Sequence, residues 1–284
     1  TYDAMYQQSI DQPEVFWAQQ AEEFLDWYKP WDSVTDVDMK AADIKWFSGG
    51  KLNVSYNCID RHLVSKANDT AIIWEGDNPS EDKKITCQEL HDHVCRFANL
   101  LKARGVKKGD RVALLLPNIP QFPIALYGIL KAGAIAVGTN FLYTPAEIES
   151  QLLDAKPRVV IACTDLIKKP IMRDLYQGFH ENRKNLNVEK VITTSVTEFL
   201  PGIKKRLAFV KVKKRKFNDT IDFMEVLNSG DTTRPESTSM TEDVAALQYT
   251  GGTTGKSKGA MLTHKNIITE VEMVCEWVRL RENN

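Results

Sequence analysis

Residues 248–264 read QYTGGTTGKSKGAMLTH, and this stretch decides the architecture that we expect. Its glycines can adopt positive φ, which lets backbone N–H groups crowd around an anion. Its threonine hydroxyls and lysine ammonium groups add donors and positive charge for phosphate oxygens. Apolar residues 244–247 precede it and a helical pattern follows Met261-Leu262. Strand, glycine loop and helix in this order predict a site for a polyphosphate.

Two alternatives share part of this pattern. A solvated linker rich in glycine, threonine, serine and lysine has the same composition and is common on protein surfaces. The Walker loop of nucleotide-hydrolysing proteins requires four residues between its first glycine and the Gly-Lys-Ser/Thr ending. Here Gly255-Lys256-Ser257 supplies the ending, but Gly251 leaves only three residues between. The Walker spacing therefore fails by one residue.

Residues 249–259 resemble the signature loop of the AMP-forming adenylate-forming enzymes, the family of acyl-CoA synthetases, luciferases and peptide-synthetase adenylation domains. That pattern runs aromatic, Thr, small, Gly, Ser/Thr, Thr, Gly, two variable residues, Lys, Gly, and Ser257 stands where proline is usual. Lys256 falls on a variable position. The resemblance implies that hydroxyls, one ammonium group and backbone N–H groups bind phosphate, at Thr250, Gly251, Gly252, Thr253, Thr254, Gly255 and Lys258.

The composition is that of a soluble globular protein. The chain has 284 residues, of which 43% are hydrophobic and 26% charged, and a formal net charge of -1. It can bury a core and has no general attraction for nucleic acid. Its five cysteines are odd in number and form no C-x-x-C pair, which argues against disulfides or a zinc site. We find no signal-peptide pattern and no long apolar run, and we expect a cytoplasmic location.

Helical periodicity and capping signals predict the main helices. Apolar spacing indicates a first helix over residues 13–28. Thr86 opens a capping box, and Gly105 stands where a C-terminal cap belongs. A third helix is expected over residues 119–131, before Gly133, and a fourth begins at a second capping box with proline in its first turn, at Thr144.

A short apolar run predicts one strand at residues 71–73. From Arg111 on, apolar runs between the helices predict strands at residues 112–116, 135–137, 159–163 and 188–193. Strand and helix alternate with short loops, so we expect a parallel sheet covered on both faces. The predicted fold class is α/β, with layered parallel sheets flanked by helices. Ligands of such sheets collect at the carboxyl ends of the strands, where the loop after residues 244–247 would open.

Several charged residues are expected to carry no chemistry. Asp60, Arg61 and His62 are consecutive, which is typical of a solvated helix end or a local ion pair. His91 and His93 are two apart on a predicted helix and point to different faces, so they cannot hold a metal together. We predict ordinary surface or half-buried roles for both histidines.

Two subfamilies are resembled by different parts of the chain. Residues 46–63 and 71–77 resemble the N-terminal region of acetyl-CoA synthetases, whereas residues 114–137 and 141–161 resemble long-chain fatty acid–CoA ligases. The seam falls near residues 107–110, at a turn that both subfamilies share. A divergent lineage, a recombination and an engineered chimera would each produce it.

The resemblance implies ATP-dependent activation of a carboxylate to an acyl-AMP, followed by thioester formation with coenzyme A. Fatty acids are the preferred substrates, acetate is the alternative, and a non-catalytic nucleotide- or lipid-binding fragment is the alternative of another class. Mg²⁺ is expected with ATP, but no residue is assigned as its ligand. No catalytic residue is assigned either.

The resemblance also implies a domain organisation. Residues 1–70 are expected to form a helical and irregular N-terminal lobe on the core, and residues 71–284 the first α/β part of the AMP-binding domain. In the family, the adenine, ribose and acyl pockets, the mobile C-terminal domain and its catalytic lysine follow later in the sequence. We therefore expect the N-terminal part of a larger enzyme, inactive alone.

A basic stretch with interleaved apolar residues runs from Lys204 to Lys216. One interpretation is peripheral contact with an anionic membrane surface, since basic residues near apolar ones attract acidic head groups. A solvated insertion is at least as good an interpretation, because basic runs are commonly that.

Overall fold

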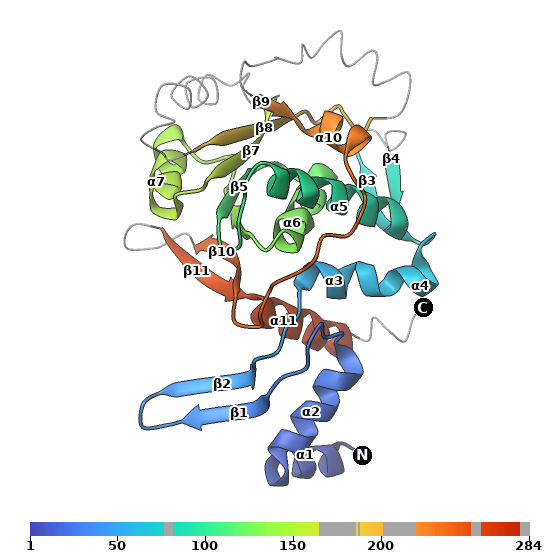
Figure 1. Cartoon of the computed structure of the whole chain (residues 1–284), viewed down its shortest axis with the longest axis vertical. Helices are drawn as coiled ribbons and strands as arrows, with labels where there is room; N and C mark the ends of the chain where they lie inside the picture. Colours follow the sequence, from blue (N-terminus) through green and yellow to red (C-terminus); the bar gives the residue numbers. More distant parts are fainter. Residues whose placement is uncertain (77–81, 165–185, 187, 201–219, 251–256, 279–284) are drawn as a thin grey trace.

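The computed structural model describes residues 1–76, 82–164, 186, 188–200, 220–250 and 257–278. Figure 1 shows a central sheet with helices packed on it, and a smaller part below built from the N-terminal helices and a β-hairpin. The described helices are α1 (Tyr2–Asp11), α2 (Pro13–Phe24), α3 (Val54–Cys58), η1 (Asp60–His62), α4 (Leu63–Lys66), α5 (Cys87–Ala103), α6 (Gln121–Lys131), α7 (Pro145–Ala155), α10 (Phe223–Ser229) and α11 (His264–Trp277). The described strands are β1 (Ser33–Asp38), β2 (Asp43–Ser48), β3 (Thr70–Glu75), β4 (Asp82–Thr86), β5 (Arg111–Leu115), β6 (Ile135–Gly138), β7 (Val159–Cys163), β8 (Lys190–Thr194), β9 (Thr220–Asp222), β10 (Val244–Thr250) and β11 (Lys258–Thr263).

The central sheet has seven strands in the order β11-β10-β6-β5-β7-β8-β9. The pairs from β10 to β9 are parallel, and β11 is antiparallel to β10. The parallel sheet predicted from the alternation of strands and helices is therefore confirmed. The β1–β2 and β3–β4 pairs form separate antiparallel hairpins.

Both faces of the sheet are buried. Val112 and Leu114 of β5 belong to a hydrophobic cluster that includes residues of α5 and α6. Ala113 and Leu115, between them, belong to a second cluster with residues of α7. Successive strand residues point to opposite faces, so this division shows helices on both sides. Figure 1 shows α5 and α6 side by side along one face.

The helix starts predicted from capping boxes are confirmed. The Thr86 side chain accepts from the Glu89 N–H at 3.1 Å, and the Glu89 carboxylate accepts from the Thr86 N–H at 2.9 Å. The same reciprocal bonds open α7 at Thr144. Gly105 and Gly133 follow α5 and α6 with φ of 82° and 79°, as C-terminal caps require.

The first predicted helix is shorter than expected, because α2 ends at Phe24. The residues after Phe24, which were expected to continue the helix, make other contacts instead. The Asp26 N–H donates to Asn57 Oδ1 at 2.9 Å, and the Trp27 ring turns back to donate to the Ala21 carbonyl at 2.9 Å. These contacts take the chain out of the helix after Phe24, which helical spacing alone does not show.

Asp60 corrects the expectation of a solvated or local charge. Its side chain is 1% exposed and accepts from Lys131 Nζ of α6 at 2.5 and 2.7 Å. His91 of α5 lies 3.3 Å away and also donates to it. Burial raises the pKa of Asp60, but the His91 hydrogen bond and the Lys131 charge outweigh this and hold it below its ordinary value. The buried Asp60 carboxylate thus joins η1, α5 and α6.

His91 is charged at neutral pH because of this contact. The hydrogen bond to Asp60, followed by that to Cys95, raises the pKa of His91 to about 10 against the opposing effect of burial. His93 lies beside the Phe199 ring instead, at 6.4 Å between ring centres. The two histidines point to different surroundings, as predicted.

Breaking the Asp60–Lys131 pair should destabilise the fold strongly. A buried carboxylate that loses its lysine keeps only the longer His91 contact, so we expect Lys131→Met to lower the free energy of unfolding by about 3 kcal/mol, the low end of the range for a broken buried pair. Urea denaturation of the chain measures this. Lys29→Met removes an exposed pair with Asp32 and should cost less than about 1 kcal/mol. Equal losses for the two variants would contradict the role of burial.

Candidate functional site

The predicted phosphate loop connects two neighbouring strands of the sheet. Residues 251–256 lie outside the described part of the chain, between β10 and β11. At the loop's borders, Tyr249 pairs with Gly259 and Thr250 with Lys258. Because β10 runs parallel to β6, the loop opens at the carboxyl edge of the sheet, where ligands of such sheets bind.

The element after the loop is a strand, which corrects the expected strand–loop–helix order. Residues Lys258–Thr263 pair with β10, and the helix α11 begins only at His264, with Thr263 and Asn266 in a capping box. A strand of this length spans about 20 Å, so the N-terminus of α11 is far from the loop. The N-terminal dipole of α11 therefore does not act on an anion at the carboxyl end of β10.

Thr250 and Lys258 are the predicted site residues that the structure describes. They stand opposite each other, and residues paired in this way share a face of the sheet with Cβ atoms about 5 Å apart. Both are exposed. The Ser257 hydroxyl donates to the Thr250 carbonyl at 2.6 Å and holds the border of the loop. A hydroxyl and an ammonium group can therefore reach one phosphate together.

The other predicted site residues lie outside the described residues, and their phosphate contacts stay predictions. They are Gly251, Gly252, Thr253, Thr254 and Gly255. Lys256, at a variable position of the motif, lies there too.

Tyr249 points to the opposite face from Thr250 and reaches α7. Its hydroxyl donates to Asp154 Oδ2 at 2.5 Å, and the residue is 8% exposed. Burial, and next the bond to Asp154, raises the pKa of Tyr249. Its ring covers Gly259, where an added Cβ would lie 3.1 Å from two ring carbons. Gly259 therefore lets the tyrosine ring lie close against the opposite strand.

Strands β10 and β11 form a hairpin around the loop, and His264 fixes the end of this hairpin that lies away from the loop. The ring Nδ1 of His264 accepts from the Val54 N–H at 3.2 Å, and the backbone N–H of His264 donates to the Asp243 carbonyl at 3.0 Å. Burial is the main cause that lowers the pKa of His264, to about 4, so the ring is a neutral acceptor at neutral pH. The contact joins the start of α11 to the start of α3.

Neither Asp154 nor His264 was identified from the sequence. Asp154 lies in the last turn of a predicted helix, and no spacing rule connects it to Tyr249. His264 follows the loop motif directly, but its partner Val54 is far away in the sequence. Both roles come from contacts between distant segments.

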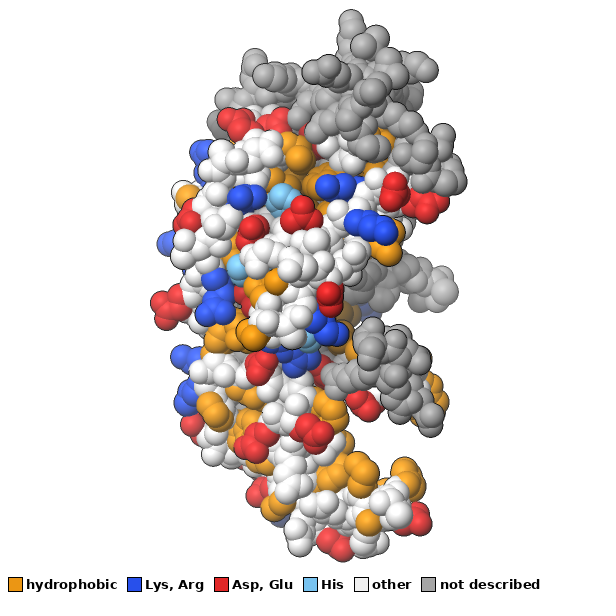
Figure 2. All heavy atoms as spheres, turned by 90° about the vertical axis from the view of Figure 1, so that its right-hand side faces the viewer, with side chains coloured by type: hydrophobic (Ala, Val, Ile, Leu, Met, Phe, Trp, Pro, Cys, Tyr) orange, Lys and Arg blue, Asp and Glu red, His pale blue; other side chains and the backbone are white. Residues whose placement is uncertain are grey.

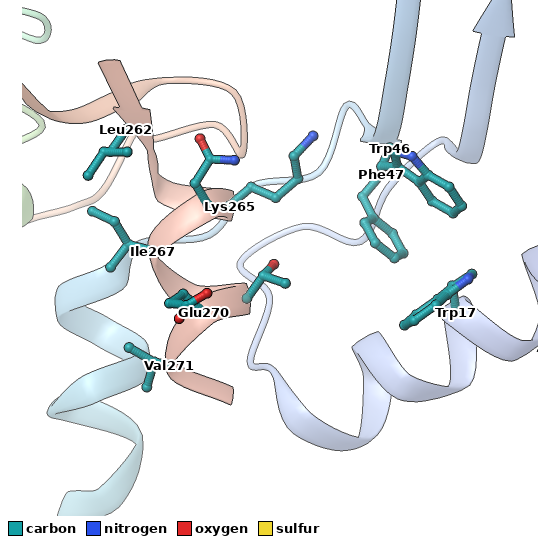
Figure 3. Close-up of a pocket in the computed structure, with 10 residues that line it drawn as sticks. Trp17, Trp46, Phe47, Leu262, Lys265, Ile267, Glu270 and Val271 are labelled. Carbon is teal, nitrogen blue, oxygen red and sulfur yellow. The ribbon is translucent and has the colours of Figure 1, made fainter. Parts of the chain in front are cut away.

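Two apolar grooves lie between α11 and the N-terminal part. The first has a volume of about 940 Å³ and is lined by Trp17, Trp46 and Phe47 on one side and by residues of α11 on the other. Figure 3 shows these three rings facing the helix across the gap. The second groove, of about 750 Å³, continues toward Met273 and Trp277. Among the described residues of the candidate phosphate site, neither Thr250 nor Lys258 lines a groove.

The surface changes in character along the molecule. Figure 2 shows acidic and basic side chains interspersed over the upper part of one face, and hydrophobic side chains together with acidic ones over its lower part. The N-terminal helices expose Tyr2, Tyr6, Ile10 and Val15. None of the described helices is both long and apolar enough to cross a membrane. The basic stretch Lys204 to Lys216 lies outside the described residues.

No group of three or more His, Cys, Asp or Glu side chains within the described residues is arranged to hold a metal ion. The magnesium ion expected with ATP therefore stays without an assigned ligand.

A glycine- and threonine-rich sequence at the carboxyl edge of a parallel α/β sheet stands where ligands of such sheets, including nucleotides, bind. The sequence comparison identifies the family. The chain belongs to the AMP-binding enzymes, whose family model matches residues 59–283. A second model, that of the acetyl-coenzyme A synthetase N-terminus, matches residues 2–58.

Curated relatives match nearly the whole chain. It is 36% identical to acetyl-coenzyme A synthetase 2 of Pseudomonas aeruginosa over 279 residues, which cover 98% of this chain and 41% of that protein. It is 39% identical to acetyl-coenzyme A synthetase of Bdellovibrio bacteriovorus over 284 aligned positions, covering 98% and 41%. The chain thus spans about two fifths of the length of these relatives.

The fold matches a solved structure of similar architecture. Acetoacetyl-CoA synthetase from Streptomyces lividans superposes with a TM-score of 0.79 at 21% identity. The match covers 96% of this chain and 40% of that one. It confirms the adenylate-forming type of α/β fold predicted from the loop motif.

The buried neutral His264 should make the fold sensitive to acid. Its pKa is about 4 in the folded chain and about 6.5 when unfolded, so the unfolded chain takes up the proton first as the pH falls. Stability from this residue is present above about pH 6.5 and falls by roughly 2 kcal/mol by pH 5. Urea denaturation at both pH values measures the loss.

The matched variant is His264→Asn, which keeps a side-chain acceptor but does not titrate. We expect it to lose less stability than the wild type between pH 7 and pH 5. Equal losses in the two proteins would show that His264 does not cause the acid sensitivity.

Proposed function

We propose that this chain is the N-terminal part of an AMP-forming acid–thiol ligase and that it supplies the site for the phosphates of ATP. One observation carries the proposal. In a chain of the AMP-binding enzyme family, Thr250 and Lys258 stand opposite each other at the mouth of the glycine loop. The chain covers only 41% of the length of its relatives, which supports the view that further chain completes the enzyme. We call the complete enzyme the full-length parent.

The reaction that we propose has two displacements. A carboxylate oxygen attacks the α-phosphorus of ATP, and the bond to pyrophosphate breaks to leave an acyl-AMP. The sulfur of coenzyme A then attacks the acyl carbon, AMP departs, and the thiol proton is lost to solvent or a base. The products are the thioester, AMP and pyrophosphate.

In the first step, Lys258 and the threonine hydroxyls counter the repulsion between negative charges. The carboxylate and ATP repel each other, and negative charge builds up on the departing pyrophosphate. Lys258 offsets part of this charge, while Thr250 and the backbone N–H groups of the loop orient the phosphates. When bound, Mg²⁺ would neutralise further phosphate charge.

We propose a short carboxylate, with acetate first, as the acyl substrate. The acetyl-CoA synthetase relatives match on both sides of residues 107–110, and the model of their N-terminus matches residues 2–58. Fatty acids, which the sequence favoured, are the second candidate. The resemblance of residues 114–137 and 141–161 to long-chain ligases supports them.

We further propose a cytoplasmic location, because the cysteine pattern fits a reducing compartment. Peripheral membrane contact through residues 204–216 belongs with the fatty-acid alternative, since a lipid substrate would be met at a membrane surface.

The full-length parent should exchange labelled pyrophosphate into ATP only when a carboxylate is present. We expect Lys258→Ala to lower this exchange by about 100-fold or more, as loss of one group that stabilises transition-state charge does. Thr253→Ala should lower it as well. Lys190→Ala removes an exposed lysine at the opposite, amino edge of the sheet and should leave the exchange unchanged.

Two results would contradict the proposal. Carboxylate-dependent exchange by residues 1–284 alone would show that the missing part is not essential. ATP binding without any carboxylate-dependent exchange in the parent would favour the non-catalytic binding module.

A panel of carboxylates from acetate to palmitate separates the two substrates. We expect the highest kcat/KM for acetate, with a fall as the chain lengthens, because each extra methylene must fit a pocket built for a short acyl group. Highest kcat/KM for palmitate would establish the fatty-acid alternative.

A further inference from the structure

The border of the candidate phosphate site is tied to a helix outside the hairpin. Tyr249 precedes Thr250 directly, and its pairing partner Gly259 follows Lys258 directly. The two residues on the α7 face of the hairpin therefore adjoin the two exposed residues at the mouth of the loop. Any movement of Tyr249 moves Thr250 with it.

Tyr249 has two constraints on its position. Its hydroxyl donates to the Asp154 carboxylate at 2.5 Å, and its ring lies so close to Gly259 that an added Cβ would be 3.1 Å from two ring carbons. The ring also packs within the second hydrophobic cluster, with residues of β5, β6 and α7. The ring therefore packs closely against β11 at Gly259, and the hydroxyl links β10 to α7.

Asp154 is carried by a helix that is itself fixed. Gln151, one turn earlier on the same face of α7, donates to the Gly138 carbonyl at 2.9 Å and to the Thr139 hydroxyl at 3.2 Å. Ile148 and Leu152 are fully buried against the sheet. α7 is thus fastened to the carboxyl end of β6, the strand beside β10.

We propose that Tyr249 is a positioning residue for ATP: through Asp154 it fixes the mouth of the loop so that Thr250 and Lys258 are held where the phosphates bind. It touches no substrate. The inference rests on the proposed function and adds the residues that set the geometry of its phosphate site.

Removal of the hydroxyl alone separates positioning from folding. Tyr249→Phe keeps the ring on Gly259 and in the cluster, so the fold should survive. We expect the Kd of the full-length parent for an α,β-methylene ATP analogue to rise about tenfold, the effect of losing a hydrogen bond to a charged group. At saturating ATP, the rate of carboxylate-dependent exchange should change by less than about threefold.

Asp154→Ala should raise the Kd by the same factor, and the double variant should raise it no further, because both changes remove one interaction. The matched control is Tyr127→Phe. Tyr127 is a half-buried tyrosine whose hydroxyl interacts with Cys58, and it packs against the other hydrophobic cluster. Its loss should leave the Kd unchanged.

Isothermal titration calorimetry gives the Kd without turnover, and this keeps the two proposals distinguishable. A parent that binds the analogue but shows no exchange would refute the proposed function. The Kd values of the Tyr249 variants would still test whether Tyr249 positions the phosphate site. An unchanged Kd in Tyr249→Phe, a melting temperature that falls without a change in Kd, or additive effects in the double variant would each overturn the positioning role. A parent that does not bind the analogue would overturn both.

Discussion

The parallel pairing of β10 with β6 is the constraint on which the candidate site depends. It joins Ala246–Gln248 to Ala136–Gly138, after the chain has passed through α7, β7, β8, β9 and α10. Without this pairing, the glycine loop would be a surface turn at no particular place. With it, the loop stands at the same edge as the carboxyl ends of β5, β6 and β7, where a parallel sheet binds its ligands.

The hairpin is held at both ends by contacts with earlier parts of the chain. Tyr249 and Asp154 join the loop end of the hairpin to α7, and His264 joins its other end to Val54. The segment around Val54 is itself fixed by the buried Asp60–Lys131 pair a few residues later. The N-terminal segment that matches the acetyl-CoA synthetase model therefore supports the strand that carries the phosphate loop.

Local signals made much of this fold predictable. The capping boxes at Thr86 and Thr144 need only residues three positions apart, and the apolar runs of β5, β6 and β7 reflect burial on both faces. The sequence failed where a distant segment decides the outcome. Contacts with Asn57 accompany the end of α2. Pairing with β10 makes residues 258–263 a strand. Lys131 of α6 supplies the positive charge that pairs with the Asp60 carboxylate. In the site, the motif predicts Thr250 and Lys258 as phosphate ligands but gives no sign of Asp154.

Hydrogen exchange of the full-length parent, with and without the α,β-methylene ATP analogue, tests the central claim most directly. If the loop holds the phosphates, amide exchange should slow at residues 249–259, because loop N–H groups become bonded to phosphate oxygens. Unchanged exchange in these residues, with slowing at α2 and α11 around the apolar grooves instead, would place the nucleotide elsewhere and contradict the account.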